Sequence, residues 1–140
     1  MISRTAKHAL AALTVLAELP DGQFAGAGAI ANEIDAPRNY LGKLLQTLAG
    51  EGLVESQKGK GGGFRLARSP ASISAIDVVQ PIDHISRWSD CFLGRQRCSG
   101  DSPCAVHDRW AQVRDVYLDF LRQTTIAGLA ARAGISTNRT

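Results

Sequence analysis

Residues 37–68 constrain the fold of this 140-residue chain more than any other segment. Leucines at positions 41, 44, 45 and 48 share one face of a helix that begins with Pro37, a residue suited to the first helical position, and ends at Gly50. Strand-like runs follow at residues 53–57 and 64–68, and the glycine-rich turn between them predicts a β-hairpin. A helix with one apolar face, followed directly by a hairpin, is the second half of a winged helix-turn-helix.

Apolar periodicity predicts further helices on both sides of this segment. Residues 3–19 and 28–34 precede it as a long and a short helix, and residues 74–82, a long stretch from 103 onward and residues 124–133 follow it. The predicted class is therefore mainly α with a small β-hairpin wing. We expect a winged helix-turn-helix domain over residues 1–82, a cysteine-containing sensor loop over 83–104, a long C-terminal dimerisation helix with its tail over 105–133, and disorder over 134–140.

Basic residues concentrate in the same segment as the predicted helix and hairpin. Between residues 36 and 69, six basic residues stand against two acidic ones, whereas the whole chain has a net charge of only +3. Amide and cationic side chains on an outer helix face can reach base edges and phosphates, and a glycine turn lets lysines approach a DNA backbone closely. Each feature alone fits a solvated surface, but their order favours double-stranded DNA. The side chains concerned are Arg38, Asn39, Lys43 and Gln46 on the helix, with Lys58 and Lys60 in the turn.

Three cysteines and a histidine lie within 17 residues of one another, at Cys91, Cys98, Cys104 and His107. Thiolate and imidazole ligands crowded onto one loop can hold a metal ion or an iron–sulfur cluster. These are the only cysteines in the chain, and an odd number fits a disulfide framework poorly, which favours the reducing cytoplasm. An iron–sulfur cluster, a zinc ion and a thiol-based redox sensor all remain compatible with this pattern.

The long predicted helix carries an unusually large apolar stripe for a small chain. Such a stripe suits packing against a second copy, and a dimer would require an operator with two roughly palindromic half-sites. Cys104 and His107 are three residues apart near the expected start of this helix, which would put them on one face. The stripe comprises Val106, Trp110, Val113, Tyr117, Phe120 and Leu121.

Four sequence motifs together resemble a family of bacterial winged-helix regulators that includes the iron–sulfur regulator IscR and the nitric-oxide-responsive repressor NsrR. The motifs are HALAALTVLA, NYLGKLLQTLAGEGLVESQKGKGGGFRLARSP, ISAIDVV and CSGDSPCAVHDRW. The resemblance covers residues 2–133 and implies a homodimeric repressor or activator. It implies a recognition helix that presents Arg38, Asn39, Tyr40 and Lys43, and a wing that presents Lys58, Gly59, Lys60 and Gly61. It also implies a cluster, 2Fe–2S rather than 4Fe–4S, on Cys91, Cys98, Cys104 and His107.

The chain departs from this family pattern at several positions. Lys58 stands where the family usually has arginine, and an ammonium group lacks the planar donor fork of a guanidinium. Lys7 stands where NsrR-like members have an acidic cluster ligand, and His8 stands where tyrosine is common. The gap between the first two cysteines is six residues rather than five. These differences weaken an NsrR-type site more than an IscR-type site.

Other classes of function fit the sequence less well. An iron–sulfur or zinc protein for electron transfer or metal trafficking could use the same four ligands, but it would need neither the basic helix nor the hairpin. An enzyme built on Cys104 and His107 lacks a recognisable third group to orient the histidine. No apolar run approaches the roughly 20 residues that span a bilayer, and the Ala/Leu-rich start has helical periodicity rather than the pattern of a signal peptide. We therefore expect a cytoplasmic protein without a membrane partner.

Overall fold

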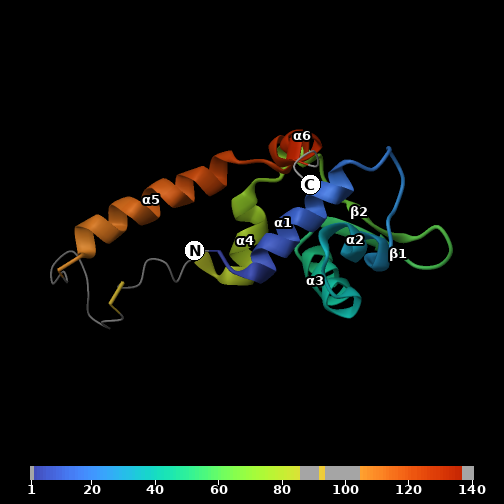
Figure 1. The fold of residues 1–140 in the computed structure, drawn as a ribbon, viewed down its shortest axis with the longest axis horizontal. Helices are drawn as coiled ribbons and strands as arrows, with labels where there is room; N and C mark the ends of the chain where they lie inside the picture. Colours follow the sequence, from blue (N-terminus) through green and yellow to red (C-terminus); the bar gives the residue numbers. More distant parts are fainter. Residues whose placement is uncertain (1, 86–91, 94–104, 137–140) are drawn as a thin grey trace.

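The computed structural model describes residues 2–85, 92–93 and 105–136. Within these ranges the fold is mainly helical with a two-stranded antiparallel hairpin, which confirms the predicted class (Figure 1). In chain order, the elements are α1 (Arg4–Ala17), α2 (Ala27–Ile34), α3 (Arg38–Gly50), β1 (Val54–Gln57), β2 (Gly63–Leu66), a 3-10 turn η1 (Pro70–Ser72), α4 (Ala75–Asp83), α5 (His107–Gln123) and α6 (Ile126–Ser136).

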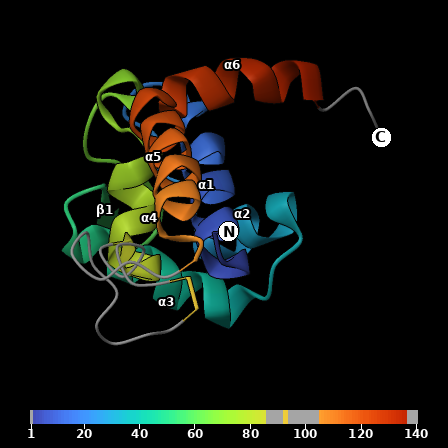
Figure 2. The ribbon, with the colours of Figure 1, turned by 90° about the vertical axis from the view of Figure 1, so that its left-hand side faces the viewer.

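The first helix is the centre of the fold. Ser3 caps α1 by accepting a hydrogen bond from the Ala6 amide at 3.0 Å, and three fully buried alanines, at positions 6, 9 and 12, line its inner face. Because alanine side chains are short, other helices can approach α1 closely. Figure 2 shows α1 in the middle, with α2, α3, α4 and α6 arranged around it.

Helices α2 and α3 form the helix-turn-helix. The turn between them begins at Asp35, which adopts a left-handed conformation with φ of 57°, and Pro37 then precedes the first turn of α3. The four leucines at positions 41, 44, 45 and 48 are all buried, as their spacing predicted. Burial of a leucine side chain contributes about 2 kcal/mol of transfer free energy, so this face fixes which side of α3 points outward.

The hairpin is attached to the helices by a backbone pairing that the sequence did not predict. Within the hairpin, Val54 pairs with Leu66 and Gln57 with Gly63. Ala25, just before α2, forms an isolated bridge with Phe64, with backbone hydrogen bonds of 2.9 and 2.7 Å. The hairpin is therefore held against the entrance of the helix-turn-helix.

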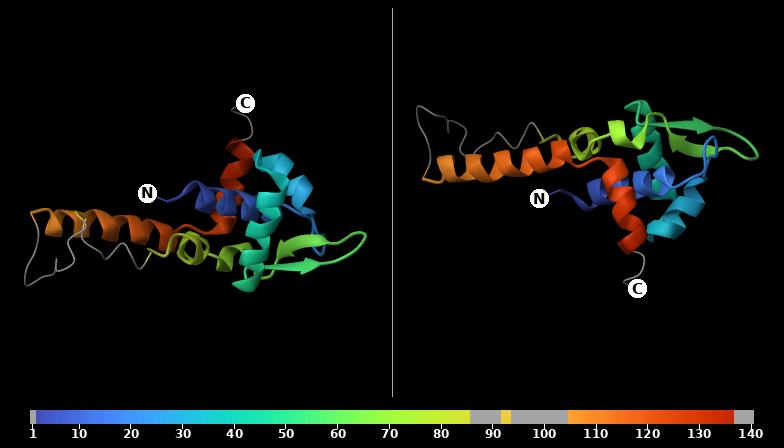
Figure 3. Two further views of the ribbon diagram at one scale, coloured as in Figure 1. Left: turned by 90° about the horizontal axis from the view of Figure 1, so that it is seen from below. Right: turned by 90° about the horizontal axis from the view of Figure 1, so that it is seen from above.

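Helix α5 extends from the body as a long arm, and its packing against the body is mainly on α4 (Figures 1 and 3). Helix α6 then returns to pack on α1. Backbone hydrogen bonds from Ala75 to Thr124 and from Ile126 to Ile73 tie the junction between α5 and α6 to the start of α4. In Figure 3 the hairpin and the start of α5 lie at opposite ends of the molecule.

The two largest differences from the predicted helix boundaries are at the start of α5 and the end of α6. Helix α5 begins at His107, and residues 105–106 form a turn, because the β-branched Val106 adopts a non-helical φ of −112° as the N-cap. Helix α6 continues to Ser136, so residues 134–136, which we expected to be disordered, are helical. A single glycine such as Gly134 lowers helix stability by only about 1 kcal/mol, which does not stop a helix whose earlier turns are packed. Among the described helices, none combines the length and apolar character that a bilayer crossing requires.

Candidate nucleic-acid interface

The outward face of α3 lines a surface hollow of about 580 Å³, which we call the α3 hollow. The four helix side chains that the sequence singled out for DNA binding, Arg38, Asn39, Lys43 and Gln46, are all exposed here. Gly42 brings α3 close to the start of α2, since a Cβ atom at Gly42 would lie 3.8 Å from that of Ala27. The hollow is lined by Ala27, Arg38, Asn39, Gly42, Lys43, Gln46 and Phe64.

One edge of the α3 hollow adjoins the N-terminus of α2. The N-cap of α2 is Gly26, which provides no capping side chain, and the first amide groups of a helix have no partner within it. The Arg38 side chain lies close by, since a Cβ atom at Gly28 would be 3.2 Å from its Nε. The helix N-terminus and the guanidinium together favour a negatively charged group such as a phosphate.

Tyr40 faces inward rather than outward. It is half-buried against the core, and its hydroxyl lies 2.9 Å from Nδ1 of His8 on α1. The two rings meet edge to face, with centroids 5.4 Å apart and planes at 72°. The Tyr40 hydroxyl is therefore hydrogen-bonded within the protein. The direct DNA contact that the family resemblance implied for Tyr40 stays a prediction.

The tip of the hairpin presents Lys58, Gly59, Lys60 and Gly61, all exposed as predicted. We use the term wing for β1, β2 and the turn of residues 58–62. Gly59 and Gly61 have φ values of 91° and 80°, which glycine adopts without strain. Figure 3, whose left panel views the molecule from below, shows the wing projecting beside α3.

The two other basic residues between positions 36 and 69, Arg65 and Arg68, make contacts within the fold. Arg65 pairs with Glu55, lies 4.4 Å above the ring of Phe24 and donates a 3.4 Å hydrogen bond to the Gly22 carbonyl. Arg68 donates to the Ser72 carbonyl. Arg68 nevertheless stays exposed, and Arg65 is half-buried. The other basic side chains between residues 36 and 69 are exposed and make no ion pair with the described residues; they are Arg38, Lys43, Lys58 and Lys60.

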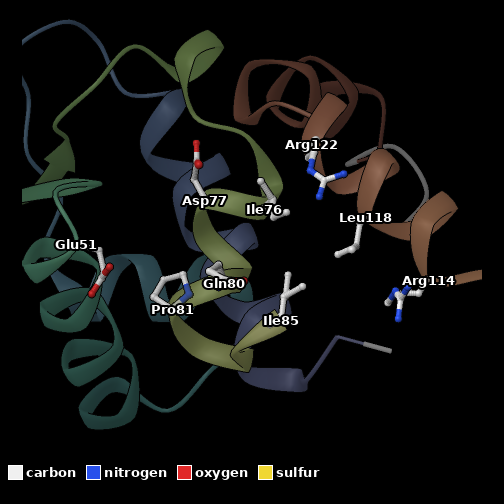
Figure 4. Close-up of a pocket in the computed structure, with 9 residues that line it drawn as sticks. All are labelled: Glu51, Ile76, Asp77, Gln80, Pro81, Ile85, Arg114, Leu118 and Arg122. Carbon is white, nitrogen blue, oxygen red and sulfur yellow. The ribbon is translucent and has the colours of Figure 1, made fainter. Parts of the chain in front are cut away.

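Helix α5 presents two contrasting faces. Toward α4 it contributes Arg114, Leu118 and Arg122 to a hollow of about 650 Å³ (Figure 4). On another face lies the α5 stripe, which we define as Val113, Val116, Tyr117 and Phe120. Val113, Val116 and Phe120 are 54%, 73% and 58% exposed, and Phe120 stacks on Tyr117 with ring centroids 6.2 Å apart. Exposed apolar residues gathered on one helix face mark a surface for association.

The predicted metal ligands lie mostly outside the described residues. Cys91, Cys98 and Cys104 fall in undescribed segments, whereas His107 is the first residue of α5 and is half-buried. Within residues 2–85, 92–93 and 105–136, no three His, Cys, Asp or Glu side chains are grouped to hold a metal ion. One contact joins the residue after Cys91 to the first turn of α5: the ring centroids of Phe92 and Trp110 lie 5.5 Å apart. Phe92 follows Cys91 in sequence and Trp110 is one turn from His107, so the chain next to the first cysteine lies near the start of α5.

Known proteins are similar to this chain in sequence and in fold. A family model, Rrf2, described as an iron-dependent transcriptional regulator, matches residues 2–132. A candidate HTH-type transcriptional regulator of Aquifex aeolicus is 34% identical over 131 residues, which cover 92% of this chain and 90% of that protein. The regulator IscR of Pectobacterium carotovorum is 34% identical over 88 residues, which cover 63% of this chain and 53% of IscR. The structure of CymR, the global cysteine regulator of Bacillus subtilis, matches with a TM-score of 0.78 at 25% identity, covering 94% of this chain and 97% of CymR.

Proposed function

This chain belongs to the Rrf2 family of transcriptional regulators, which are not enzymes, and we propose that it acts as a cytoplasmic homodimer that binds double-stranded DNA through α3 and the wing. The observation that carries the proposal is the α3 hollow, where Arg38, Asn39 and Lys43 project from one exposed helix face. Asparagine and glutamine amides pair with adenine edges, and arginine or lysine with guanine or phosphate. The leucine face on the other side of α3 anchors the helix while its outer side enters a major groove.

The wing supports the same proposal from a second direction. Lys58 and Lys60 are exposed beside Gly59 and Gly61, where an added Cβ would meet no atom within 4 Å, so their ammonium groups can approach phosphates beside the groove that α3 would occupy. In a homodimer, two copies of this surface would meet two half-sites of a roughly palindromic operator. The exposed α5 stripe supplies an apolar surface for that dimer.

The salt dependence of DNA binding tests this proposal. Each phosphate contact that is lost should reduce the slope of log affinity against log salt by about 1. We expect Lys43→Ala and Lys58→Ala each to lower affinity and slope. Arg122→Ala serves as the matched control, because Arg122 is an exposed cation on α5 beside the hollow in Figure 4. Unchanged slopes for both lysine variants, or an equal loss for Arg122→Ala, would contradict the proposed interface.

We further propose that Cys91, Cys98, Cys104 and His107 hold an iron–sulfur cluster, with 2Fe–2S favoured over 4Fe–4S, and that the state of this site controls operator binding. The donor set fits, because thiolates and one imidazole are established cluster ligands. The contact between Phe92 and Trp110 supports it by holding the chain beside Cys91 near the start of α5. A bound cluster would supply a centre sensitive to oxidation. His107 would transmit its state because it begins the helix that carries the α5 stripe.

The alternatives for this site are zinc and direct thiol chemistry, and a protein of electron transfer or metal trafficking could use the same ligands. Protein purified without oxygen should show visible charge-transfer absorption with iron and sulfide in equal amounts, and Cys98→Ser should lose them. Colourless protein that contains one zinc ion per chain would show that the site holds zinc instead of a cluster. Metal-free protein whose DNA affinity responds to thiol oxidation would indicate thiol sensing instead. Cluster-loaded protein without salt-dependent DNA binding would indicate an electron carrier.

A further inference from the structure

We propose that His8 is a positioning residue for the recognition helix, and that Tyr40 contributes to DNA binding through His8 rather than by touching DNA with its hydroxyl. This inference rests on the proposed DNA-binding function and assigns a role to a contact between two helices. The residues come from positions 32 apart in sequence, one on α1 and one in the first turn of α3.

The contact between the two side chains has both a polar and an apolar component. The Tyr40 hydroxyl lies 2.9 Å from Nδ1 of His8, and the edge of one ring meets the face of the other at a centroid distance of 5.4 Å. Both side chains are half-buried. A phenol can donate or accept a hydrogen bond, and so can a neutral imidazole at Nδ1 according to its tautomer, so the pair forms with either tautomer.

The first turn of α3 needs such an anchor. Its N-cap is Pro37, which makes no side-chain capping bond, and the turn contains no acidic residue. The buried leucines begin only at Leu41. Arg38 and Asn39, which face the α3 hollow, therefore lie in an uncapped turn ahead of the packed part of the helix, where helix ends are least constrained. Tyr40 connects that turn to α1.

Helix α1 is rigid enough to serve as the reference. His8 lies between Ala6 and Ala9, which are both fully buried, and α1 packs on four other helices. Its start is also tied to α4, because the amide and hydroxyl of Ser3 donate to the Asp83 carboxylate. A hydrogen bond from α1 to Tyr40 holds the first turn of α3 in place before DNA binds. Binding then costs less conformational entropy, because that turn is already ordered.

A double-mutant cycle tests the inference on the full-length protein. Tyr40→Phe removes only the hydroxyl, His8→Phe keeps a ring but removes Nδ1, and His8→Asn restores a polar atom near that position. The DNA probe is a duplex that the wild-type protein selects from a random-sequence pool. Thr14→Val is the matched control, because it removes a 2.8 Å side-chain bond within α1 that does not involve α3.

We expect Tyr40→Phe and His8→Phe each to raise the dissociation constant for DNA about fivefold, because each removes one hydrogen bond of typical net strength. The double variant should also lose about fivefold rather than about 25-fold, because both changes remove the same bond. His8→Asn should bind within about twofold of wild type, as should Thr14→Val, and salt slopes should stay unchanged because no phosphate contact is lost.

Several outcomes would overturn the inference. A loss in Tyr40→Phe with none in His8→Phe would show that the hydroxyl contacts DNA directly. Additive losses, or full affinity in both single variants, would show that the pair does not position α3. In these cases the wild-type protein still binds its selected duplex, so the proposed function survives. A wild-type protein that enriches no sequence and binds no DNA would remove the proposed function, and this inference with it.

Discussion

Replacing Gly63 by alanine should weaken the attachment of the wing to the start of α2. Gly63 has a φ of 132°, and a Cβ atom there would lie 2.4 Å from the carbonyl oxygen of Ala25 and 2.8 Å from the amide nitrogen of Gly26. These neighbours are backbone atoms, which cannot rotate away as a side chain can. The two hydrogen bonds between Ala25 and Phe64, at 2.9 and 2.7 Å, must therefore lengthen or break.

The size of the effect follows from two contributions. Alanine at a backbone conformation that favours glycine costs about 1–2 kcal/mol, and each of the two lost hydrogen bonds costs about 1 kcal/mol. We therefore expect Gly63→Ala to lower the free energy of unfolding by about 3–4 kcal/mol, out of the roughly 5–15 kcal/mol typical of a domain. The matched control is Gly61→Ala, because Gly61 also has a positive φ, of 80°, but no atom within 4 Å of an added Cβ. It should lose only the strain of about 1–2 kcal/mol.

Urea unfolding followed by far-UV circular dichroism measures both variants, at one fixed protein concentration because a dimer's stability depends on it. A shift of the midpoint at constant slope reports a change in stability. If Gly63→Ala lost no more than Gly61→Ala, the pairing of Ala25 with Phe64 would not stabilise the wing, and the attachment inferred from the structure would be wrong.

Three further changes test other parts of the structure. Val116→Glu should convert the proposed dimer into monomers in sedimentation velocity, because it places a charge in the α5 stripe, whereas Gln112→Glu on an exposed position of the same helix should not. Leu121→Ala should lower the free energy of unfolding in urea by about 2–5 kcal/mol, since Leu121 is 1% exposed and joins α5 to α4; a smaller loss would mean that α5 is not docked there. Arg65→Ala should cost at most about 1 kcal/mol on its own because the ion pair is exposed, and a larger loss would show that its contact with Phe24 matters more than we infer.

Local sequence signals were sufficient for most of the elements. The leucine spacing correctly identified α3 and its inner face, and the lysine-tipped glycine run correctly identified the hairpin. The sequence predicted that α5 begins at Pro103 with Ser102 as its cap, two residues that lie outside the described ones, whereas the structure begins α5 at His107 with Val106 as the N-cap. The cysteine motif was visible in the sequence, but the mutual arrangement of its ligands stays a prediction.

The sequence by itself determined the order of the helices, the buried face of α3 and the place of the hairpin turn, because periodicity, capping and glycine conformations act over a few neighbouring residues. Only the tertiary structure decided which polar groups remain available for a ligand. Arg65 counted as a free cation until its contacts with Glu55 and Phe24 were known, and Tyr40 counted as an outward residue until His8 was found beside it. The first of these pairs lies across the hairpin, whereas the other two contacts join residues 41 and 32 positions apart. No local pattern records which distant side chains the packing of the elements will bring together.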